Sequence, residues 1–213
     1  MFAAVATYTG LFYTLKCFGF DPLKARAFNS FINAAFLSYM GIISFSAFLV
    51  HQYDTPTYLL RKPEQVWLTD YIIGFFTIDL VLGHFYGGLN LITGYVHHSV
   101  YILLLLYLRL YHESNLIYLC LPFELPTMFQ SLQQISPQHY RPYLSAAFGS
   151  TFVLFRLVGN SIVIYMAYQV SMLYTIVASL MMITHIAWFS EWTYKRLLTK
   201  PRQEEPKVIT SHA

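Results

Sequence analysis

Charged side chains are scarce in this sequence, where Asp, Glu, Lys and Arg together make up 11% of 213 residues. Soluble domains usually carry about 25%, so this composition excludes an ordinary soluble fold. The formal net charge is only +3, and the basic residues are scattered along the chain. This excludes the concentrated positive surface that nucleic-acid binding requires.

Cysteine and clustered histidine are also lacking. The two cysteines, Cys17 and Cys120, exclude a disulfide framework, and we expect both to be packing residues. The eight histidines form no HxxxH or HxxHH box, whereas a di-iron lipid hydroxylase needs several imidazoles from neighbouring helical turns. We therefore expect no metal site and no bound cofactor. No predicted helix carries a stripe of like charges, which argues against an ion channel.

Apolar residues, by contrast, make up 56% of the chain and occur in long runs. Because a helix needs about 20 residues to cross a bilayer, the runs predict an all-α polytopic membrane protein with about seven transmembrane helices. Their expected bounds are 1–18, 30–51, 69–88, 91–111, 116–132, 142–169 and 171–194.

The domain organisation follows from these runs. We expect an N-terminal transmembrane helix at 1–20, one membrane domain at 24–197 and a disordered tail at 198–213, where charge and proline replace apolar residues. The first run lacks the basic start and cleavage site of a secretory signal, so it predicts a retained helix, with an uncleaved signal anchor as the alternative. The longest early loop is expected at 52–64.

Proline and glycine mark the predicted breaks. The segment 21–26 interrupts the first two runs, because its proline disfavours helix at the preceding residue. Gly87 and Gly88 predict a turn, since glycine accepts the backbone angles that end a helix. Pro122 and Pro126 each remove a helical hydrogen bond and predict a kinked fifth span.

Basic residues at the helix ends predict the orientation. Nine of the 13 Lys and Arg residues fall on one side if the spans alternate. They are Lys16, Lys24, Arg26, Arg141, Lys195, Arg196, Lys200, Arg202 and Lys207. By the positive-inside rule this side is cytosolic, so we expect a lumenal N-terminus and a cytosolic C-terminus.

Several ionisable side chains fall inside the predicted spans. Placing such groups in the membrane costs free energy, so their presence suggests a functional site. At about 1.5 Å per residue, five of them lie roughly 9 to 15 Å from the cytosolic helix ends. These are His97, His98, Glu124, Asp79 and His185. Arg156 comes out roughly 21 Å deep, in the lumenal half, where it would pair with an acidic group or meet a head group.

The adjacent histidines His97 and His98 are the most unusual of these groups. A neutral imidazole is a base or nucleophile when a carboxylate fixes its tautomer, and Asp79 and Glu124 are the available carboxylates. Adjacent helical residues point about 100° apart, so we expect one histidine to do the chemistry and the other to hold a helix or substrate. The structural alternative is that these groups only join helices through hydrogen bonds, which is the commoner role for a lone histidine such as His185.

Four short motifs occur in order along the chain: YIIGFFTIDL at 71–80, HH at 97–98, FELPT at 123–127 and FRL at 155–157. Together they resemble the TLC-domain superfamily, which includes ceramide synthases and smaller TLC-domain proteins. The resemblance covers about 24–196. It implies a six-helix membrane barrel preceded by one helix, typically in the endoplasmic reticulum, with a tunnel in which ceramide synthases join a fatty acyl group from acyl-CoA to a sphingoid amine.

The resemblance also assigns roles. The pair at 97–98 matches the family's histidines, one of which takes or helps transfer the acyl group, and Asp79 and Glu124 match acidic positions in the neighbouring helices. Ceramide synthases have a second aspartate about one turn after the first in the later helix, where this chain has Thr127 and Met128. In this respect the chain is more similar to the small members that are not synthases.

Two functions follow as expectations. The first is acyl transfer from acyl-CoA to a lipid amine, with the CoA thiolate as leaving group. The second is non-enzymatic: a TLC-type protein that binds or senses lipid, shapes membrane composition or escorts cargo. The expected catalytic residues are His97, His98, Asp79 and Glu124, and the expected substrate-binding residues are His185, Arg156 and Thr127. The expected partners are membrane lipid and fatty acyl-CoA, and the sequence leaves a monomer and a homodimer open.

Overall fold

The computed structural model describes residues 1–50, 63–110 and 120–198. These residues form helices joined by short links, with no strand among them. The α-helices are α1 (Phe2–Cys17), α2 (Pro22–Val50), α4 (Pro63–Tyr86), α5 (His97–Leu110), α7 (Leu125–Ile135), α8 (Arg141–Thr151), α9 (Asn160–Val170) and α10 (Met172–Leu198). The other helices are η1 (Leu91–Val96) and η4 (Phe152–Gly159), which are π-helices, and η2 (Leu121–Glu124) and η3 (Gln138–Tyr140), which are 3₁₀-helices.

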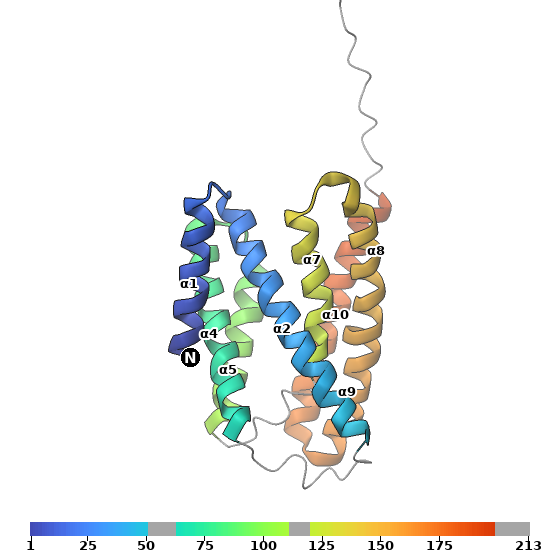
Figure 1. Ribbon diagram of the computed structural model, residues 1–213. Coiled ribbons are helices and arrows are strands. Elements are labelled where there is room, and N and C mark those ends of the chain that lie inside the picture. The colour runs from blue at the N-terminus through green and yellow to red at the C-terminus, as the bar shows by residue number, and fades with distance from the viewer. Residues whose placement is uncertain (51–62, 111–119, 199–213) are drawn as a thin grey trace, which may run out of the picture.

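The helices lie roughly parallel to one long axis, and successive long helices run in alternate directions (Figure 1). In this view α1, α4 and α5 form one group, and α7 to α10 form another. Helix α2 crosses obliquely between them, packing against α1 and α4 in the first group and against α7 in the second. This single long helix therefore joins the two halves.

Helix α2 begins earlier than the sequence predicts. Asp21 accepts hydrogen bonds at Oδ2 from the backbone N–H groups of Leu23 (3.1 Å) and Lys24 (3.3 Å), and Pro22 occupies the first helical position, where no N–H is needed. The segment 21–26 was expected to be an interruption, and that prediction is wrong from Pro22 onward. The earlier start brings Arg26 into the helix.

Buried residues of α1 lie on one face, spaced four apart at Ala4, Tyr8 and Phe12, as expected for a helix packed along one stripe. Polar contacts join this face to α2: the side-chain Nδ2 of Asn29 donates to the carbonyl of Tyr8 at 3.0 Å, and the Tyr8 hydroxyl bonds Oδ1 of Asn33 at 3.3 Å. Hydrogen bonds of this kind help helices to associate in a membrane, where the hydrophobic effect does not drive helices together.

The predicted turn is confirmed at Gly87 and Gly88, whose φ angles are 83° and 87°. These are left-handed values that favour glycine. In the described part of the predicted fifth span, the 3₁₀-helix η2 leads directly into α7, with Pro122 and Pro126 in their first turns. The predicted tail at 198–213, apart from Leu198 at the end of α10, and most of the predicted loop at 52–64 lie outside the described residues.

Three helical stretches of the described part are long and apolar enough to cross a membrane: Val66–Tyr86, Gln138–Gln169 and Met172–Arg196. A membrane protein with several crossings is therefore supported. The seven predicted crossings are not confirmed, because this measure finds three in the described part of the chain. The predicted fourth and fifth spans also run into residues 111–119, outside the described part.

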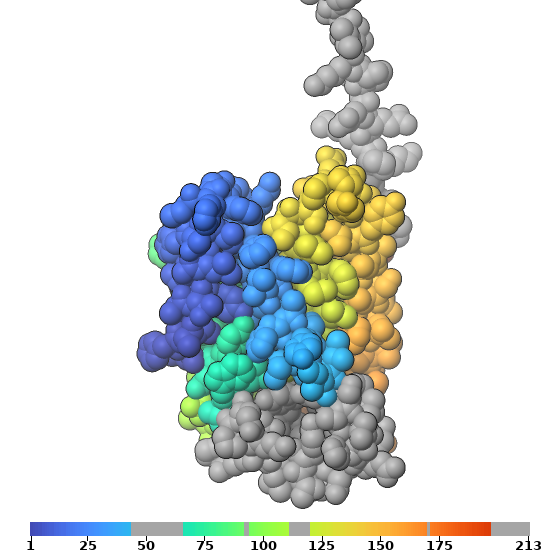
Figure 2. Space-filling view, viewed as in Figure 1, coloured from blue at the N-terminus to red at the C-terminus, as the bar shows by residue number. Residues whose placement is uncertain are grey.

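The ends of α1 and α10 and the starts of α2 and α8 lie at the same end of the molecule, the upper end in Figure 1. Lys16, Lys24, Arg141, Lys195 and Arg196 belong to these helix ends. Five of the six described members of the predicted cytosolic set are thus gathered at one end, and the sixth, Arg26, lies in the second turn of α2. At this end Figure 2 shows a notch between the blue N-terminal helices and the yellow α7.

Candidate functional site

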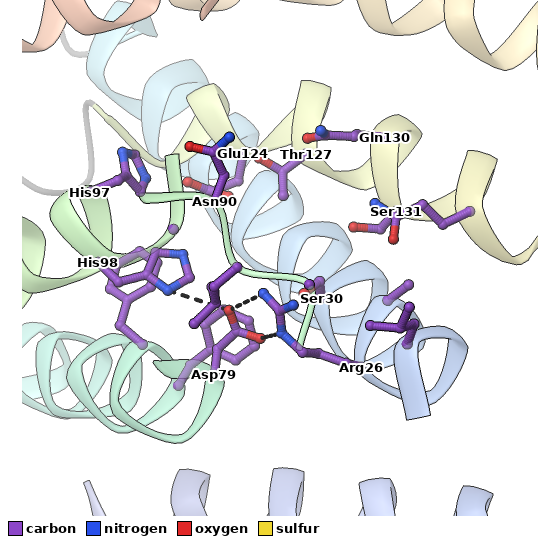
Figure 3. A pocket seen from close by; sticks show the side chains of 18 of the residues that line it. Arg26, Ser30, Asp79, Asn90, His97, His98, Glu124, Thr127, Gln130 and Ser131 are labelled. Carbon is purple, nitrogen blue, oxygen red and sulfur yellow. Dashed lines mark hydrogen bonds and ion pairs between the residues drawn. The ribbon is translucent and has the colours of Figure 1, made fainter. Parts of the chain in front are cut away.

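A cavity of about 360 Å³ lies among α2, α4, α5 and α7, with further residues from η1, η4 and α10 (Figure 3). Its size is within the range of small-molecule sites. The polar lining residues are Arg26, Ser30, Asp79, Asn90, His97, His98, Glu124, Thr127, Gln130, Ser131, Gln134 and Arg156. The cavity extends to Leu23 and Gln134, near the end of the molecule where the notch lies.

Asp79 on α4 is the most constrained of these side chains. It is 4% exposed, and Arg26 on α2 holds both of its oxygens: Nε donates to Oδ1 at 2.8 Å and Nη2 donates to Oδ2 at 3.1 Å. The third nitrogen of Arg26, Nη1, donates to the carbonyl of Gly87 at 3.2 Å. The buried carboxylate is therefore paired through two charge-assisted hydrogen bonds.

His98 lies beside this ion pair. Its Nδ1 is 3.3 Å from Oδ2 of Asp79, as drawn in Figure 3. The contact is within ion-pair distance, although Nδ1 makes no well-formed hydrogen bond to a described residue. The ring packs against Phe76, with centroids 4.8 Å apart. With Nδ1 turned toward the carboxylate, Nε2 is the nitrogen left for another partner.

His97 also lines the cavity, but no carboxylate among the described residues is paired with it as Asp79 is with His98. Its ring lies 4.4 Å from that of Tyr101 and 5.5 Å from that of His98, centroid to centroid. It makes no hydrogen bond to a described residue. The two histidines therefore differ in their contacts, since His98 lies against Asp79. The predicted division into one catalytic and one positioning histidine stays a prediction.

Glu124, the last residue of η2, and Thr127, in the first turn of α7, line the cavity, and the lining continues along α7 at Gln130, Ser131 and Gln134. These positions recur every three or four residues, which places them on one face of a helix. This spacing in the sequence indicates a polar helix face, of which only Glu124 and Thr127 were predicted as site residues.

Arg156 lies in the π-helix η4 and is 2% exposed. Its Nε donates to the carbonyl of Phe123 at 2.8 Å, and Nη2 donates to the Thr127 hydroxyl at 2.6 Å. The guanidinium carbon is 4.6 Å from the centroid of Trp188, a cation–π distance. Nη1 is buried and has no hydrogen-bond partner among the described residues.

Arg156 was expected roughly 21 Å from the cytosolic helix ends, in the lumenal half. The structure places it in the lining of the same cavity as the histidines, and its depth in the membrane stays a prediction. His185 was expected to contact substrate, but it is 2% exposed and does not line the cavity. Its ring faces those of Phe123 and Phe152, at 6.2 and 6.0 Å.

Sequence reasoning missed Arg26, which it grouped with basic residues flanking the membrane. It also missed both π-helices. Helix η1 leads directly into His97, and η4 contains Arg156. π-Helical segments frequently occur at functional sites. Among the described residues, no three His, Cys, Asp or Glu side chains are grouped so as to hold a metal ion.

Comparisons of the chain with protein-family models, with curated proteins and with solved structures gave no match.

Proposed function

We propose that this protein is a TLC-type membrane protein that handles lipid acyl chains, and that His98 transfers an acyl group from a thioester such as acyl-CoA to a lipid amine. The observation that carries the proposal is the 3.3 Å contact between Nδ1 of His98 and Oδ2 of Asp79 at the wall of a cavity. The proposal includes the seven crossings and the endoplasmic reticulum membrane that the resemblance implies.

The catalytic step uses the geometry of His98. With the proton on Nδ1, the lone pair is on Nε2, which attacks the thioester carbonyl carbon. The carbon–sulfur bond breaks, and CoA leaves as its thiolate. The imidazole now carries an acyl group and a positive charge, which the Asp79 carboxylate stabilises.

The second step releases the product. The neutral amine of the acceptor attacks the acyl carbon, the bond to Nε2 breaks, and the electron pair returns to the imidazole. The amine's proton passes to His97 and then to the thiolate, so that the products are an amide and CoA thiol. His97, which also lines the cavity and is not held by an acid, is placed for this transfer.

The remaining lining residues bind and position the acyl group. Arg156 and Thr127 are hydrogen-bonded to each other, and Glu124 is on the same helix face as Thr127. Phe75, Phe76 and Trp188 supply the apolar walls that an acyl chain requires. The cavity extends toward the end of the molecule that we propose is cytosolic, the side from which acyl-CoA would come.

A second candidate is lipid binding without chemistry. The observation that favours it is the pairing of both Asp79 oxygens with Arg26, which neutralises the carboxylate that His98 would use. In this case the ion pair joins α2 to α4, and the cavity holds a lipid for sensing or carriage.

The test is acyl transfer by the purified full chain in vesicles, supplied with a long-chain acyl-CoA and a long-chain amine. The variant His98→Asn is expected to lose about 10²-fold or more of the rate, the usual contribution of a positioned proton-transfer group. His84→Asn is the matched control, because His84 contacts Tyr95 at 3.2 Å and does not line the cavity. Equal rates in the wild type and His98→Asn would contradict the catalytic role, and bound lipid with no amide product would favour the second candidate.

A further inference from the structure

The charges that line the cavity are balanced. Arg26 and Arg156 contribute two positive charges, Asp79 and Glu124 contribute two negative ones, and no lysine is among the lining residues. With both histidines neutral, the formal charge of the lining is zero. A charged group entering such a site would lack a counter-ion, which is costly away from water.

Both arginines already donate hydrogen bonds to protein groups. Arg26 uses all three of its nitrogens on Asp79 and Gly87. Arg156 uses Nε and Nη2 on Phe123 and Thr127, and only Nη1 has no partner among the described residues. The edge formed by Nε and Nη2, which binds a carboxylate or phosphate side by side, is therefore already engaged with protein groups in both arginines.

Uncharged hydrogen-bonding groups make up the rest of the polar lining. Ser30 of α2 and Ser131 of α7 are drawn with Gln130 and Thr127 in Figure 3. The side-chain amides of Gln130 and Gln134 make no hydrogen bond to a described residue. Amides and hydroxyls both donate and accept, so they match a ligand that carries hydroxyl, ester or amide groups.

We infer that the cavity selects a lipid whose head group is uncharged and hydrogen-bonding, over a lipid with an anionic head group. The inference rests on the proposed lipid-handling function and names its substrate class. It also agrees with the acyl-transfer step, in which the acceptor amine must be present in its neutral form to attack.

The experiment measures binding of two short-chain lipids with identical chains to the purified full-length protein in detergent. Dioctanoylglycerol has an uncharged head group, and dioctanoyl phosphatidate has an anionic one. Trp188 lines the cavity, so tryptophan fluorescence reports occupancy. The wild type is expected to bind the uncharged lipid about tenfold or more tightly, a ratio that corresponds to about 1.4 kcal/mol.

A charge placed in the lining should reverse this preference. Gln130→Lys adds a positive charge to the cavity and is expected to tighten phosphatidate binding about tenfold relative to dioctanoylglycerol. Gln133→Lys is the matched control, since Gln133 is on the same helix, does not line the cavity, and contacts the Arg141 carbonyl at 3.4 Å. If Gln130→Lys does not fold, Gln134→Lys repeats the test at a more exposed lining position.

Equal or tighter phosphatidate binding by the wild type would overturn the inference. An equal tightening of phosphatidate binding, relative to dioctanoylglycerol, in Gln130→Lys and Gln133→Lys would also overturn it. Failure of both lipids to bind would overturn the lipid-handling function and this inference together. A clear preference combined with full transfer by His98→Asn would instead support the inference and reject only the catalytic role of that histidine.

Discussion

Arg26 and Asp79 are 53 residues apart in the sequence, yet they form a two-point ion pair between α2 and α4 directly beside His98. The pair has two consequences. It ties the helix that joins the two halves of the molecule to the helix that carries the acid. It also fixes the orientation of the carboxylate that contacts the histidine.

Asp79→Asn is expected to destabilise the protein by about 3 kcal/mol or more, because it leaves the largely buried Arg26 without its counter-ion. The measurement is thermal or denaturant unfolding in one fixed detergent. Asp70→Asn is the matched control: Asp70 pairs with Arg109 at 2.6 Å, but the two side chains are 32% and 38% exposed. An exposed pair contributes about 0–1 kcal/mol. Equal losses of stability in the two variants would mean that the buried Arg26–Asp79 pair stabilises the fold no more than the exposed Arg109–Asp70 pair does.

Thr127→Val keeps the shape of the side chain and removes the hydroxyl that accepts from Nη2 of Arg156 at 2.6 Å. A buried charged donor then loses a partner, so the expected destabilisation is about 1–3 kcal/mol. Thr77→Val is the control, because its hydroxyl only donates to the carbonyl of Ile73 within the same helix. The same unfolding assay applies. A Thr127→Val protein as stable as Thr77→Val would show that the anchoring of Arg156 does not depend on this bond.

Gly41→Ala tests the close approach of α2 to η2. A Cβ at this position would lie 2.6 Å from the backbone nitrogen of Pro122, so the helices must separate, and overpacking of this kind costs about 1–3 kcal/mol. Gly10→Ala in α1 is the control, since its Cβ would meet nothing within 4 Å. That change should be neutral or stabilise by up to about 1 kcal/mol through helix propensity. Stability of both variants at or above the wild type would contradict the described packing.

The predicted orientation is tested in sealed microsomes with a tag at either end. The basic helix ends gathered at the upper end of Figure 1 are expected to face the cytosol. A C-terminal tag should therefore be digested by added protease, and an N-terminal tag should be protected until detergent is added. Protection of the C-terminal tag with digestion of the N-terminal tag would reverse the orientation, and the same result for both tags would mean an even number of crossings.

The sequence was sufficient for the features that depend on composition and local chemistry. Apolar runs predicted the helices, Gly87 and Gly88 predicted the turn, and the cost of charge in lipid singled out Asp79 and the histidine pair. The start of α2 was missed, although it could have been predicted from the sequence, because an aspartate followed by proline is a common helix beginning. The polar face of α7 could also have been predicted, from the spacing of its polar residues at every third or fourth position.

Other features depend on long-range packing and could not be read from one sequence. The partner of Asp79 is such a case, because nothing in the residues around Arg26 indicates which distant carboxylate it will meet. The separation of Arg156 from His185 is another: both are lone polar residues in apolar helices, yet only Arg156 lines the cavity. The two π-helices have no sequence signature that we could use, and they alter which way the following side chains point.

The most direct measurement of the catalytic proposal is the intact mass of the purified protein after incubation with a long-chain acyl-CoA in the absence of an amine. The wild type is expected to gain the mass of one acyl group and to lose it when a long-chain amine is added. His98→Ala is expected to gain no acyl mass, whereas His84→Ala should behave as the wild type. An adduct that persists in His98→Ala, or a wild-type protein that never acquires one, would contradict acyl transfer through His98.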